Sequence, residues 1–495
     1  MMGASMRLPF ANTYARLPER FFSRVTPAKV RDPRIIAVNR PLAELLGLDA
    51  EALASPEGAQ IFAGNAVPEG AEPIALAYAG HQFGHFAGQL GDGRAVLLGE
   101  VVGTDGLRRD IQLKGSGRTP YSRGGDGRAA LGPVLREYLV SEAMAALGVP
   151  TTRSLAAVIT GELVRRETML PGAVLVRVAA SHLRVGTFEW FAMRHDQDGL
   201  RTLTSYALGR HYPDGRGAAN EALVLLERVI AAQASLVARW LGLGFIHGVM
   251  NTDNTSISGE TIDYGPCAFL DEYDPAKTFS SIDRGGRYAF ANQPRIALWN
   301  LSRLAETLLP ALDADPDKAV ALATERLENF AALFGEAHDR VQRAKLGLSR
   351  AEPDDAARLA DLHARMAAGE VDYTLFFRRL CESAADPARD AETASGFEVP
   401  AAFHEWAARW RQRLDREPGA PDKRRAAMRA VNPAFIPRNH RIEELITAAA
   451  ERGDLAPFET FTKVLERPYD DQPEHAALRE PPARDERVQA TFCGT

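Results

Sequence analysis

The chain has 495 residues, of which 45% are hydrophobic, and it carries a formal net charge of −6 with a pI of about 6.1. This composition predicts a globular protein of two or three lobes and argues against nucleic-acid binding, for which a basic surplus is typical. No run of 18 apolar residues occurs, so we expect no membrane span. The three cysteines, Cys267, Cys381 and Cys493, favour a reducing compartment, and we expect a cytoplasmic protein.

The first predicted elements belong to a segment rich in short apolar runs and glycine. We expect a short helix at Pro41–Leu46. Ala95–Val102 and Asp110–Lys114 read as the strands of a hairpin, joined by the turn Gly103–Gly106. A helix follows from about Pro133 to Leu147, because apolar residues recur there at helical spacing and a glycine follows its end.

Further elements follow the same order along the chain. Strands are expected at Ser154–Ile159 and Ala173–Val178, and a long helix at Glu221–Leu241. Thr255–Ser258 and Glu260–Asp263 read as two short strands around a glycine. Residues 295–309 and most of 315–495 read as helical, with breaks at Pro353–Asp355 and Glu417–Asp422. A mostly β part therefore precedes a mostly α part, and a ligand site is expected at their junction.

Two glycine clusters flank the predicted hairpin. Gly91, Gly93 and Arg94 precede its first strand, and glycine there lets backbone N–H groups approach a phosphate closely. A flexible turn without a ligand is an equally good interpretation of these glycines alone. Asp126 and Gly127 lie in the second cluster, from which a mobile loop can close over a nucleotide.

Lys114 ends the second strand of the hairpin. In protein kinases a lysine at this place binds phosphate oxygens and pairs with a glutamate of the next helix. Glu137 follows 23 residues later, and we prefer it over Glu142 of the same helix. The alternative is an ordinary surface lysine.

Arg177 lies inside an apolar strand, where a charge must be paired. Its partner is either a protein carboxylate or a phosphate, which a guanidinium binds through two oxygens. Arg184 follows seven residues later. Together with Lys114 these arginines form a cationic pocket that suits a triphosphate.

The segment from His247 to Asp263 has the spacing of a kinase catalytic loop with one change. Val249 occupies the position of the catalytic aspartate and accepts no proton, while Asp253 stands beside Asn254, at the metal-binding position. Asp263 begins an Asp-x-Gly turn. Oxygen ligands of this kind suit Mg²⁺ or Mn²⁺. A solvated loop is the alternative, and we expect His247 to be structural.

Several of these segments together resemble the selenoprotein O (SelO, YdiU) family, from about residue 8 to the C-terminus. The segments that carry the likeness are Tyr78–Gly84, Leu113–Gly117, Thr119–Arg123, Asp126–Arg128, Ser181–Arg184, His247–Asn254, Asp263–Pro266 and Ala297–Leu301. The resemblance implies an α+β, bilobal protein-kinase-like fold with a β-rich N-lobe, an α-rich C-lobe and a helical C-terminal extension. It also implies transfer of AMP from ATP to Ser, Thr or Tyr hydroxyls of proteins, with the α-phosphate facing the acceptor.

The resemblance assigns a role to each candidate residue. Asp253 is the implied base, and Asn254 and Asp263 are the implied ligands of Mg²⁺ or Mn²⁺. The implied nucleotide-binding residues are Gly91, Gly93, Arg94, Lys114, Asp126, Gly127, Arg177 and Arg184, with Glu137 pairing Lys114. Cys493 matches a family position that holds selenocysteine or cysteine. Asp271–Asp283 offers it no cysteine partner, so we expect no redox control through such a pair.

These interpretations imply a division of the chain and leave other functions open. We expect an N-terminal extension at 1–74, an N-lobe at 75–200, a C-lobe with the catalytic loop at 201–345, and a helical extension at 346–495. A monomer is expected. The alternatives are a nucleotide-binding pseudokinase scaffold, a protein uridylyltransferase using UTP and Mn²⁺, and a small-molecule kinase, which Val249 argues against.

Overall fold

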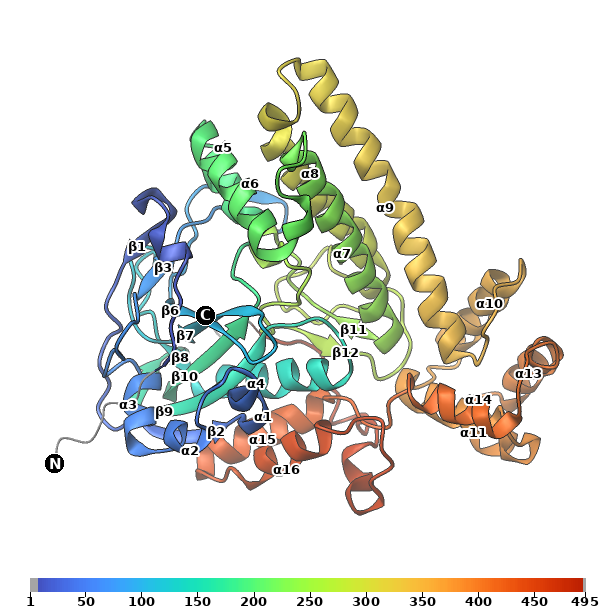
Figure 1. The fold of residues 1–495 in the computed structure, drawn as a ribbon. Coiled ribbons are helices and arrows are strands. Elements are labelled where there is room, and N and C mark those ends of the chain that lie inside the picture. Colours follow the sequence, from blue (N-terminus) through green and yellow to red (C-terminus); the bar gives the residue numbers. More distant parts are fainter. Residues whose placement is uncertain (1–7, 493–495) are drawn as a thin grey trace.

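An antiparallel sheet dominates the N-terminal part of the chain in this computed structural model, which describes residues 8–492 (Figure 1). Its strand order is β1-β3-β6-β7-β10-β9-β2, with β8 paired to β10. The strands of this sheet are β1 (Phe22–Arg24), β2 (Arg34–Val38), β3 (Ile74–Leu76), β6 (Ala95–Val102), β7 (Arg108–Lys114), β8 (Ala129–Ala130), β9 (Arg153–Arg165) and β10 (Met169–Ala179). Two further strand pairs stand apart: β4 (Gly80–Gln82) with β5 (His85–Ala87), and β11 (Phe245–Ile246) with β12 (Ala268–Phe269). Cys493 lies outside the described residues.

The predicted hairpin forms as expected. β6 and β7 pair with Ala95 opposite Lys114, so the lysine lies at the end of the hairpin away from its turn. In that turn Gly106 has a φ of 78°, a left-handed conformation that favours glycine. The Asp105 carboxylate accepts a hydrogen bond from the Leu107 N–H and closes the turn.

Both faces of the central part of the sheet are buried, which explains why β6 and the inner part of β10 are nearly continuous apolar runs. Leu97 and Leu175 face the core shared with α4 (Leu131–Ala146). Their neighbours Leu98 and Val176 face the opposite core. That second core is closed by the N-terminal helices α1 (Arg40–Leu45), α2 (Ala50–Leu53) and α3 (Pro56–Phe62).

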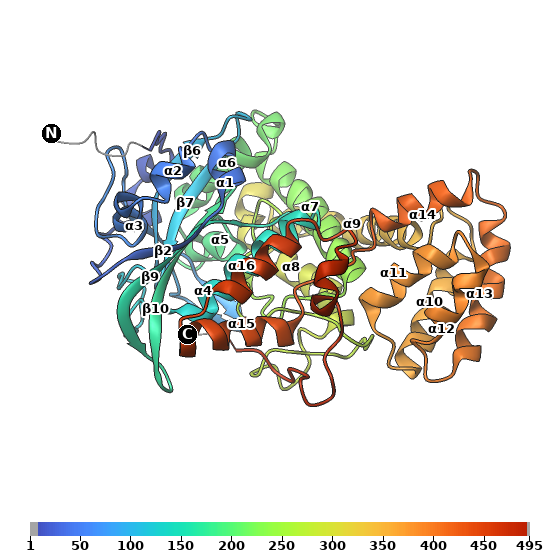
Figure 2. The same cartoon turned by 90° about the horizontal axis from the view of Figure 1, so that it is seen from below.

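The rest of the chain is helical. Its helices are α5 (Val185–Ala192), α6 (Gln197–His211), α7 (Glu221–Leu243), α8 (Gln293–Leu312), α9 (Pro316–Lys345), α10 (Asp355–Ala368), α11 (Tyr373–Ser383), α12 (Asp390–Ala394), α13 (Pro400–Leu414), α14 (Pro421–Arg429), α15 (Asn439–Arg452) and α16 (Ala456–Leu465). Helices α7, α8 and α9 pack on one another, and α15 and α16 return to pack against α4. Figure 2 shows α10–α14 as a separate group at one end of the molecule.

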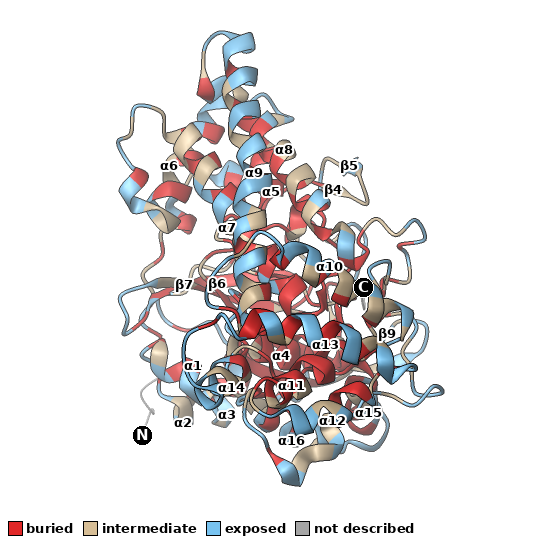
Figure 3. Ribbon diagram, turned by 90° about the vertical axis from the view of Figure 1, so that its right-hand side faces the viewer, coloured by how far each residue is buried: buried red, intermediate tan, exposed pale blue. Residues whose placement is uncertain are grey.

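Buried positions gather where α4 meets the sheet, while much of α9 is exposed along its length (Figure 3). No helix within residues 8–492 is both long enough and apolar enough to span a bilayer. The predicted mixture of helix with an antiparallel sheet is confirmed.

Four of the predicted strands differ from the structure. β9 and β10 extend well beyond Ser154–Ile159 and Ala173–Val178, because their outer ends continue to pair with each other, from Pro171 opposite Leu163 to Met169 opposite Arg165. Thr255–Ser258 and Glu260–Asp263 form turns and isolated bridges instead of strands. There the Ser258 hydroxyl bonds the Glu260 side chain, and local bonds of this kind compete with a strand ladder.

Candidate active site

The loop that follows α7 begins at a helix stop. Gly244 ends α7 in the left-handed conformation, and the chain continues through β11 to His247. The His247 ring is buried. Its Nε2 lies 2.9 Å from the Ile262 carbonyl oxygen, and its Nδ1 accepts from the Val249 N–H at 3.3 Å. Burial lowers the pKa of His247. The ring thus fastens two loops together, and the predicted structural role is confirmed.

Val249 is buried, with 3% of its surface exposed. Its carbonyl oxygen accepts a hydrogen bond from the Asn254 Nδ2 at 3.0 Å. The loop is therefore closed on itself at Val249, which offers no carboxylate.

Asp253 lies four residues further on, in the short 3-10 turn Thr252–Asn254. Its Oδ2 accepts a hydrogen bond from the Gln82 Nε2 at 3.0 Å. Its Oδ1 is buried and has no hydrogen-bond partner among residues 8–492. Burial raises the pKa of Asp253 to about 6, although the Gln82 bond and the Arg184 charge oppose this rise. A buried carboxylate with an unused oxygen and a pKa near neutrality is suited to accept a proton.

The β4–β5 hairpin covers this turn. The His81 N–H donates to the Thr252 hydroxyl at 2.6 Å, and Thr252 in turn donates to Glu189 at 2.6 Å. A Cβ at Gly80 would lie 2.7 Å from the Asp253 Oδ1, so only glycine fits there. Gln82 and Glu189 were not predicted as site residues, since their partners are distant in the sequence.

Lys114 lies at the centre of a buried charge cluster. Its Nζ is 2.5 Å from the Glu137 Oε2 and 2.8 Å from the Asp263 Oδ1. The strand–helix pair predicted with Glu137 thus forms. Glu142 instead binds Arg153 at 2.6 Å and so is not available to Lys114.

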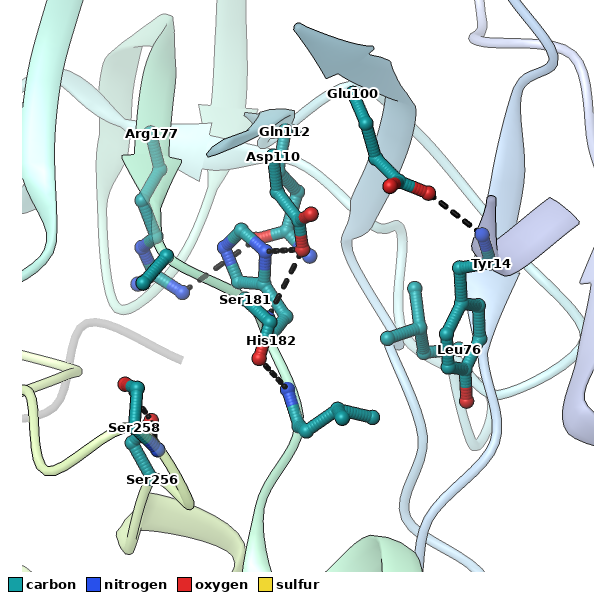
Figure 4. Close-up of polar contacts among 12 residues, drawn as sticks. Tyr14, Leu76, Glu100, Asp110, Gln112, Arg177, Ser181, His182, Ser256 and Ser258 are labelled. Carbon is teal, nitrogen blue, oxygen red and sulfur yellow. Dashed lines mark hydrogen bonds and ion pairs between the residues drawn. The ribbon is translucent and has the colours of Figure 1, made fainter. Parts of the chain in front are cut away.

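Arg177 shares Glu137 with Lys114. Its Nε donates to the Glu137 Oε1 at 2.8 Å, and its Nη2 lies 3.7 Å from the Asp263 Oδ1. Figure 4 shows the same side chain reaching toward Gln112, whose Oε1 lies 3.5 Å from Nη1. Arg177 is therefore paired with a carboxylate, the first of the two predicted partners.

Asp263 has a φ of 71°, which is strained for a residue with a side chain. Burial alone would raise its pKa, but Lys114, Arg177 and Arg94 hold it well below the usual range for aspartate. The carboxylate therefore stays ionised. A narrow pocket beside it is lined by Arg94, Lys114, Ala129, Pro133, Val134, Glu137, Leu175 and Gly265.

Arg184 connects the cationic residues with the loop. Its Nη1 donates to the Asp253 carbonyl oxygen at 3.0 Å and to the Tyr78 hydroxyl at 3.2 Å. Its guanidinium also lies 4.5 Å from the centre of the Tyr78 ring and 3.8 Å from an Asp92 oxygen. The positive charge thus adjoins the backbone of the candidate base.

The residues of the two glycine clusters have partners other than the Lys114 charge cluster. Gly91 packs against the Tyr121 ring, and a Cβ there would lie 2.3 Å from a ring atom. A Cβ on Gly93 would lie 2.8 Å from the Tyr121 carbonyl oxygen. Close packing against Tyr121 is therefore a sufficient reason for glycine at both positions. Asp126 is ion-paired with Arg166 at 2.8 Å in an exposed loop. No contact between Asp126 and the Lys114 cluster is recorded in the described part of the chain.

The oxygen donors fit a divalent cation. Asn254 and Asp263 offer an amide and an ionised carboxylate, the hard ligands that Mg²⁺ and Mn²⁺ prefer. Within residues 8–492 no group of three or more His, Cys, Asp or Glu side chains is placed to hold a metal. Phosphate oxygens and water would have to complete the shell, as is usual for Mg²⁺ bound with a nucleotide.

Comparison with known proteins gives one consistent result. The family model described as "Protein adenylyltransferase SelO" matches residues 4–466. The chain is 63% identical over 491 residues to "Protein nucleotidyltransferase YdiU" of Bradyrhizobium sp. (strain ORS 278), covering 99% of this chain and 100% of that relative. A relative of the same name from Methylorubrum populi is 62% identical over 493 residues, with 98% and 99% covered. One from Rhodopseudomonas palustris (strain BisB18) is 61% identical over 494 residues, with 99% and 100% covered.

Proposed function

The chain belongs to the SelO protein adenylyltransferase family, and from this membership we propose that it transfers AMP from ATP to Ser, Thr or Tyr hydroxyls of protein substrates. The observation that carries the proposal is the hydrogen bond from the Arg184 Nη1 to the backbone carbonyl oxygen of Asp253 at 3.0 Å. This bond holds a cation suited to phosphate at the residue whose carboxylate has an unused buried oxygen.

In the proposed reaction Asp253 accepts the proton of the acceptor hydroxyl at its Oδ1. The hydroxyl oxygen forms a bond to the α-phosphorus, the bond between that phosphorus and the oxygen leading to the β-phosphate breaks, and pyrophosphate leaves. Lys114, Arg177 and Arg184 hold the negative charge of the phosphates, and Glu137 keeps Lys114 in position. Fixed charges of this kind stabilise the transition state because they need no reorganisation.

The same site would hold the cation. Asn254 and Asp263 are the proposed ligands of Mg²⁺ or Mn²⁺, and the depressed pKa of Asp263 supports this role because the carboxylate stays ionised. A bound divalent cation supplies charge neutralisation for the triphosphate. Lys114 contacts Asp263 and would share this carboxylate with the cation.

A kinase-like arrangement in two lobes accommodates these roles. We infer an N-lobe at 75–200 and a C-lobe at 201–345, with Lys114 and Glu137 from the first and Asp253 and Asp263 from the second. The pairing of β1 with β3 and of β2 with β9 supports an extension at 1–74 that packs on the N-lobe. Residues 346–495 would form the helical extension.

Two alternatives have a specific observation in their favour. The relatives are named protein nucleotidyltransferases, a name that does not specify which nucleotide is transferred. Transfer of UMP from UTP with Mn²⁺ is therefore the second candidate. The buried Val249 favours a pseudokinase scaffold that binds nucleotide without catalysis.

The test uses the purified full chain with four labelled donors: α-labelled ATP, γ-labelled ATP, α-labelled UTP and γ-labelled UTP, each with Mg²⁺ and with Mn²⁺. AMP transfer predicts covalent label on protein from α-labelled ATP and none from γ-labelled ATP. Label from α-labelled UTP alone would establish uridylyl transfer instead. Label from γ-labelled ATP alone would overturn both. A thermal shift with ATP and no label from any donor would support the scaffold.

A further inference from the structure

Arg287 has an uncompensated guanidinium close to the loop that carries Asp253. The side chain is half-buried, and its Nε and Nη2 are buried without a hydrogen-bond partner among residues 8–492. Among residues 8–492 no carboxylate lies within 4.0 Å of this guanidinium, and the side-chain group that bonds it is the uncharged Tyr288 hydroxyl. Its carbon Cζ lies 4.6 Å from the centre of the Trp299 ring and 5.7 Å from that of Tyr288. Donors buried without a partner cost free energy, so this arginine is prepared for an anion.

Arg303 provides a contrast on the same aromatic ring. Its Cζ lies 5.0 Å from the centre of the Trp299 ring, similar to that of Arg287. However, the Arg303 Nη2 is paired with the Glu306 carboxylate at 2.6 Å. The Arg303 Nε is also buried without a partner, but of the two arginines on Trp299 only Arg303 has a carboxylate partner among residues 8–492.

Arg287 adjoins the tip of the hairpin that covers the site. A Cβ built on Gly84 would lie 3.5 Å from the Arg287 Cζ, and Gly84 is a turn residue of the β4–β5 hairpin with a φ of 84°. The residue before it in that turn, Phe83, donates its N–H to the Asn251 Oδ1 at 3.0 Å. The Tyr288 hydroxyl donates to the same oxygen at 2.6 Å.

The same hairpin contacts the proposed base. Gln82, one residue before the turn, holds the Asp253 Oδ2 at 3.0 Å. Arg287 and Asp253 therefore border one short hairpin, whose position is fixed by bonds to the loop residues 251–253. A group bound at Arg287 would lie next to the place where an acceptor hydroxyl must approach Asp253.

The nucleotide does not account for this charge. The proposed phosphate-binding residues are Lys114, Arg177 and Arg184, and none of them has a recorded contact with Arg287 within the described residues. The triphosphate already finds three cations there. The anion at Arg287 must therefore come from the other substrate, the protein acceptor.

We propose that Arg287 binds an aspartate or glutamate side chain of the acceptor protein, and so directs AMP transfer to hydroxyl residues that have an acidic neighbour. The inference rests on the proposed function and adds a specificity-determining residue to it. Trp299 and Tyr288 act as positioning residues, because their rings lie beside the guanidinium and partly desolvate it, which strengthens its bond to a carboxylate.

The test compares matched fluorescent peptides that carry one Ser, Thr or Tyr acceptor flanked by Glu, Gln or Lys. We expect wild-type protein to modify the Glu peptides with a kcat/KM about tenfold above that for the Gln peptides, since a charge-assisted hydrogen bond contributes that much. Arg287→Gln should bring this ratio to about one while the KM for ATP stays unchanged. Arg287→Glu should prefer the Lys peptides. The matched control Arg303→Gln should keep the wild-type preference.

Three outcomes would overturn the inference. These are an unchanged Glu preference in Arg287→Gln, an equal loss of preference in Arg303→Gln, and a raised KM for ATP, which would place Arg287 at the phosphates. Thermal melting of each variant identifies misfolding, and Arg287→Lys keeps the charge as a second variant. Peptide affinity measured by fluorescence anisotropy separates the two proposals. Charge-dependent binding without AMP transfer refutes only the proposed function, whereas transfer without charge dependence refutes only the role of Arg287.

Discussion

Gln82 donates a hydrogen bond to the Asp253 Oδ2 at 3.0 Å, across 171 positions of sequence. The bond fixes the carboxylate so that its unused oxygen, Oδ1, keeps one orientation. Gln82→Ala should therefore lower kcat for AMP transfer by about ten- to a hundredfold, because a misplaced catalytic group reacts slowly. The KM for ATP should change little. The exposed Gln89 provides the control, and Gln89→Ala should keep full activity. Equal kcat values for the two variants would refute the positioning role of Gln82.

Glu137 balances two buried cations, Lys114 and Arg177. Glu137→Gln leaves both charges without their main partner, which should lower the free energy of unfolding by about 3 kcal/mol and raise the KM for ATP. Glu142→Gln on the same helix removes the ion pair with Arg153 and weakens the bonds from Asn39 and Ser154, none of which touches Lys114, so the KM for ATP should stay unchanged. Chemical denaturation and ATP titration of both variants measure these effects. A similar rise in the KM for ATP in both would show that helix stability, and not the cation pair, controls binding.

Asp263 is the ionised ligand of the proposed cation site. Asp263→Ala should reduce transfer below detection, because neutralisation of phosphate charge by the cation is a large contribution to such reactions. Chelation of divalent cations should have the same effect on the wild-type protein and should be reversed by adding Mg²⁺ or Mn²⁺. Asp126→Ala changes an aspartate that Arg166 binds in an exposed loop, and its effect should be confined to the KM for ATP. Transfer retained by Asp263→Ala would remove this residue from the site.

Glu260 makes folding stability depend on pH. Burial raises its pKa to about 7 from a usual 4.5, although bonds from the Ser258 hydroxyl and the Ala180 N–H oppose the shift. At a pH between 4.5 and about 7, Glu260 keeps its proton in the folded protein, whereas it has released this proton in the unfolded chain. The stability contributed by Glu260 therefore falls as pH rises through this window and stays low above it.

Glu260→Gln removes this titration while its amide oxygen still accepts the same bonds. The Tm of the variant should fall less than that of the wild type between about pH 5 and about pH 8, with the two curves converging at the acid end. Differential scanning calorimetry across this range measures it. Parallel curves would mean that Glu260 is ionised in the folded protein throughout.

The local parts of the site could be predicted from the sequence. Lys114 and Glu137 follow from a strand and the helix after it, and His247, Asn254 and Asp263 follow from the spacing within one loop. Gln82 and Glu189 could not be found this way, because their partners lie 171 and 63 residues away. Polar turns also misled the prediction: Thr255–Ser258 has β-branched residues, but serine hydroxyls bond the local backbone and side chains there instead of allowing a strand.

The partner of a buried charge is harder to predict than the need for one. Arg177 was expected to bind either a carboxylate or a phosphate, and it is held by Glu137. Sequence alone does not decide between such partners, since both satisfy a buried guanidinium. Gly91 and Gly93 are likewise ambiguous in the sequence, because the packing of Tyr121 requires glycine at both positions whether or not a phosphate binds nearby.

The proposed reaction is tested most directly by the dependence of α-phosphate transfer on Asp253. Wild-type protein and Asp253→Asn, both shown to be folded by thermal melting, are incubated with α-labelled or γ-labelled ATP and a protein acceptor. AMP transfer with Asp253 as base predicts α-label on the acceptor with the wild type, at least a hundredfold less with Asp253→Asn, and no γ-label with either. Incorporation of γ-label, or α-label that is equal in the two proteins, would contradict it.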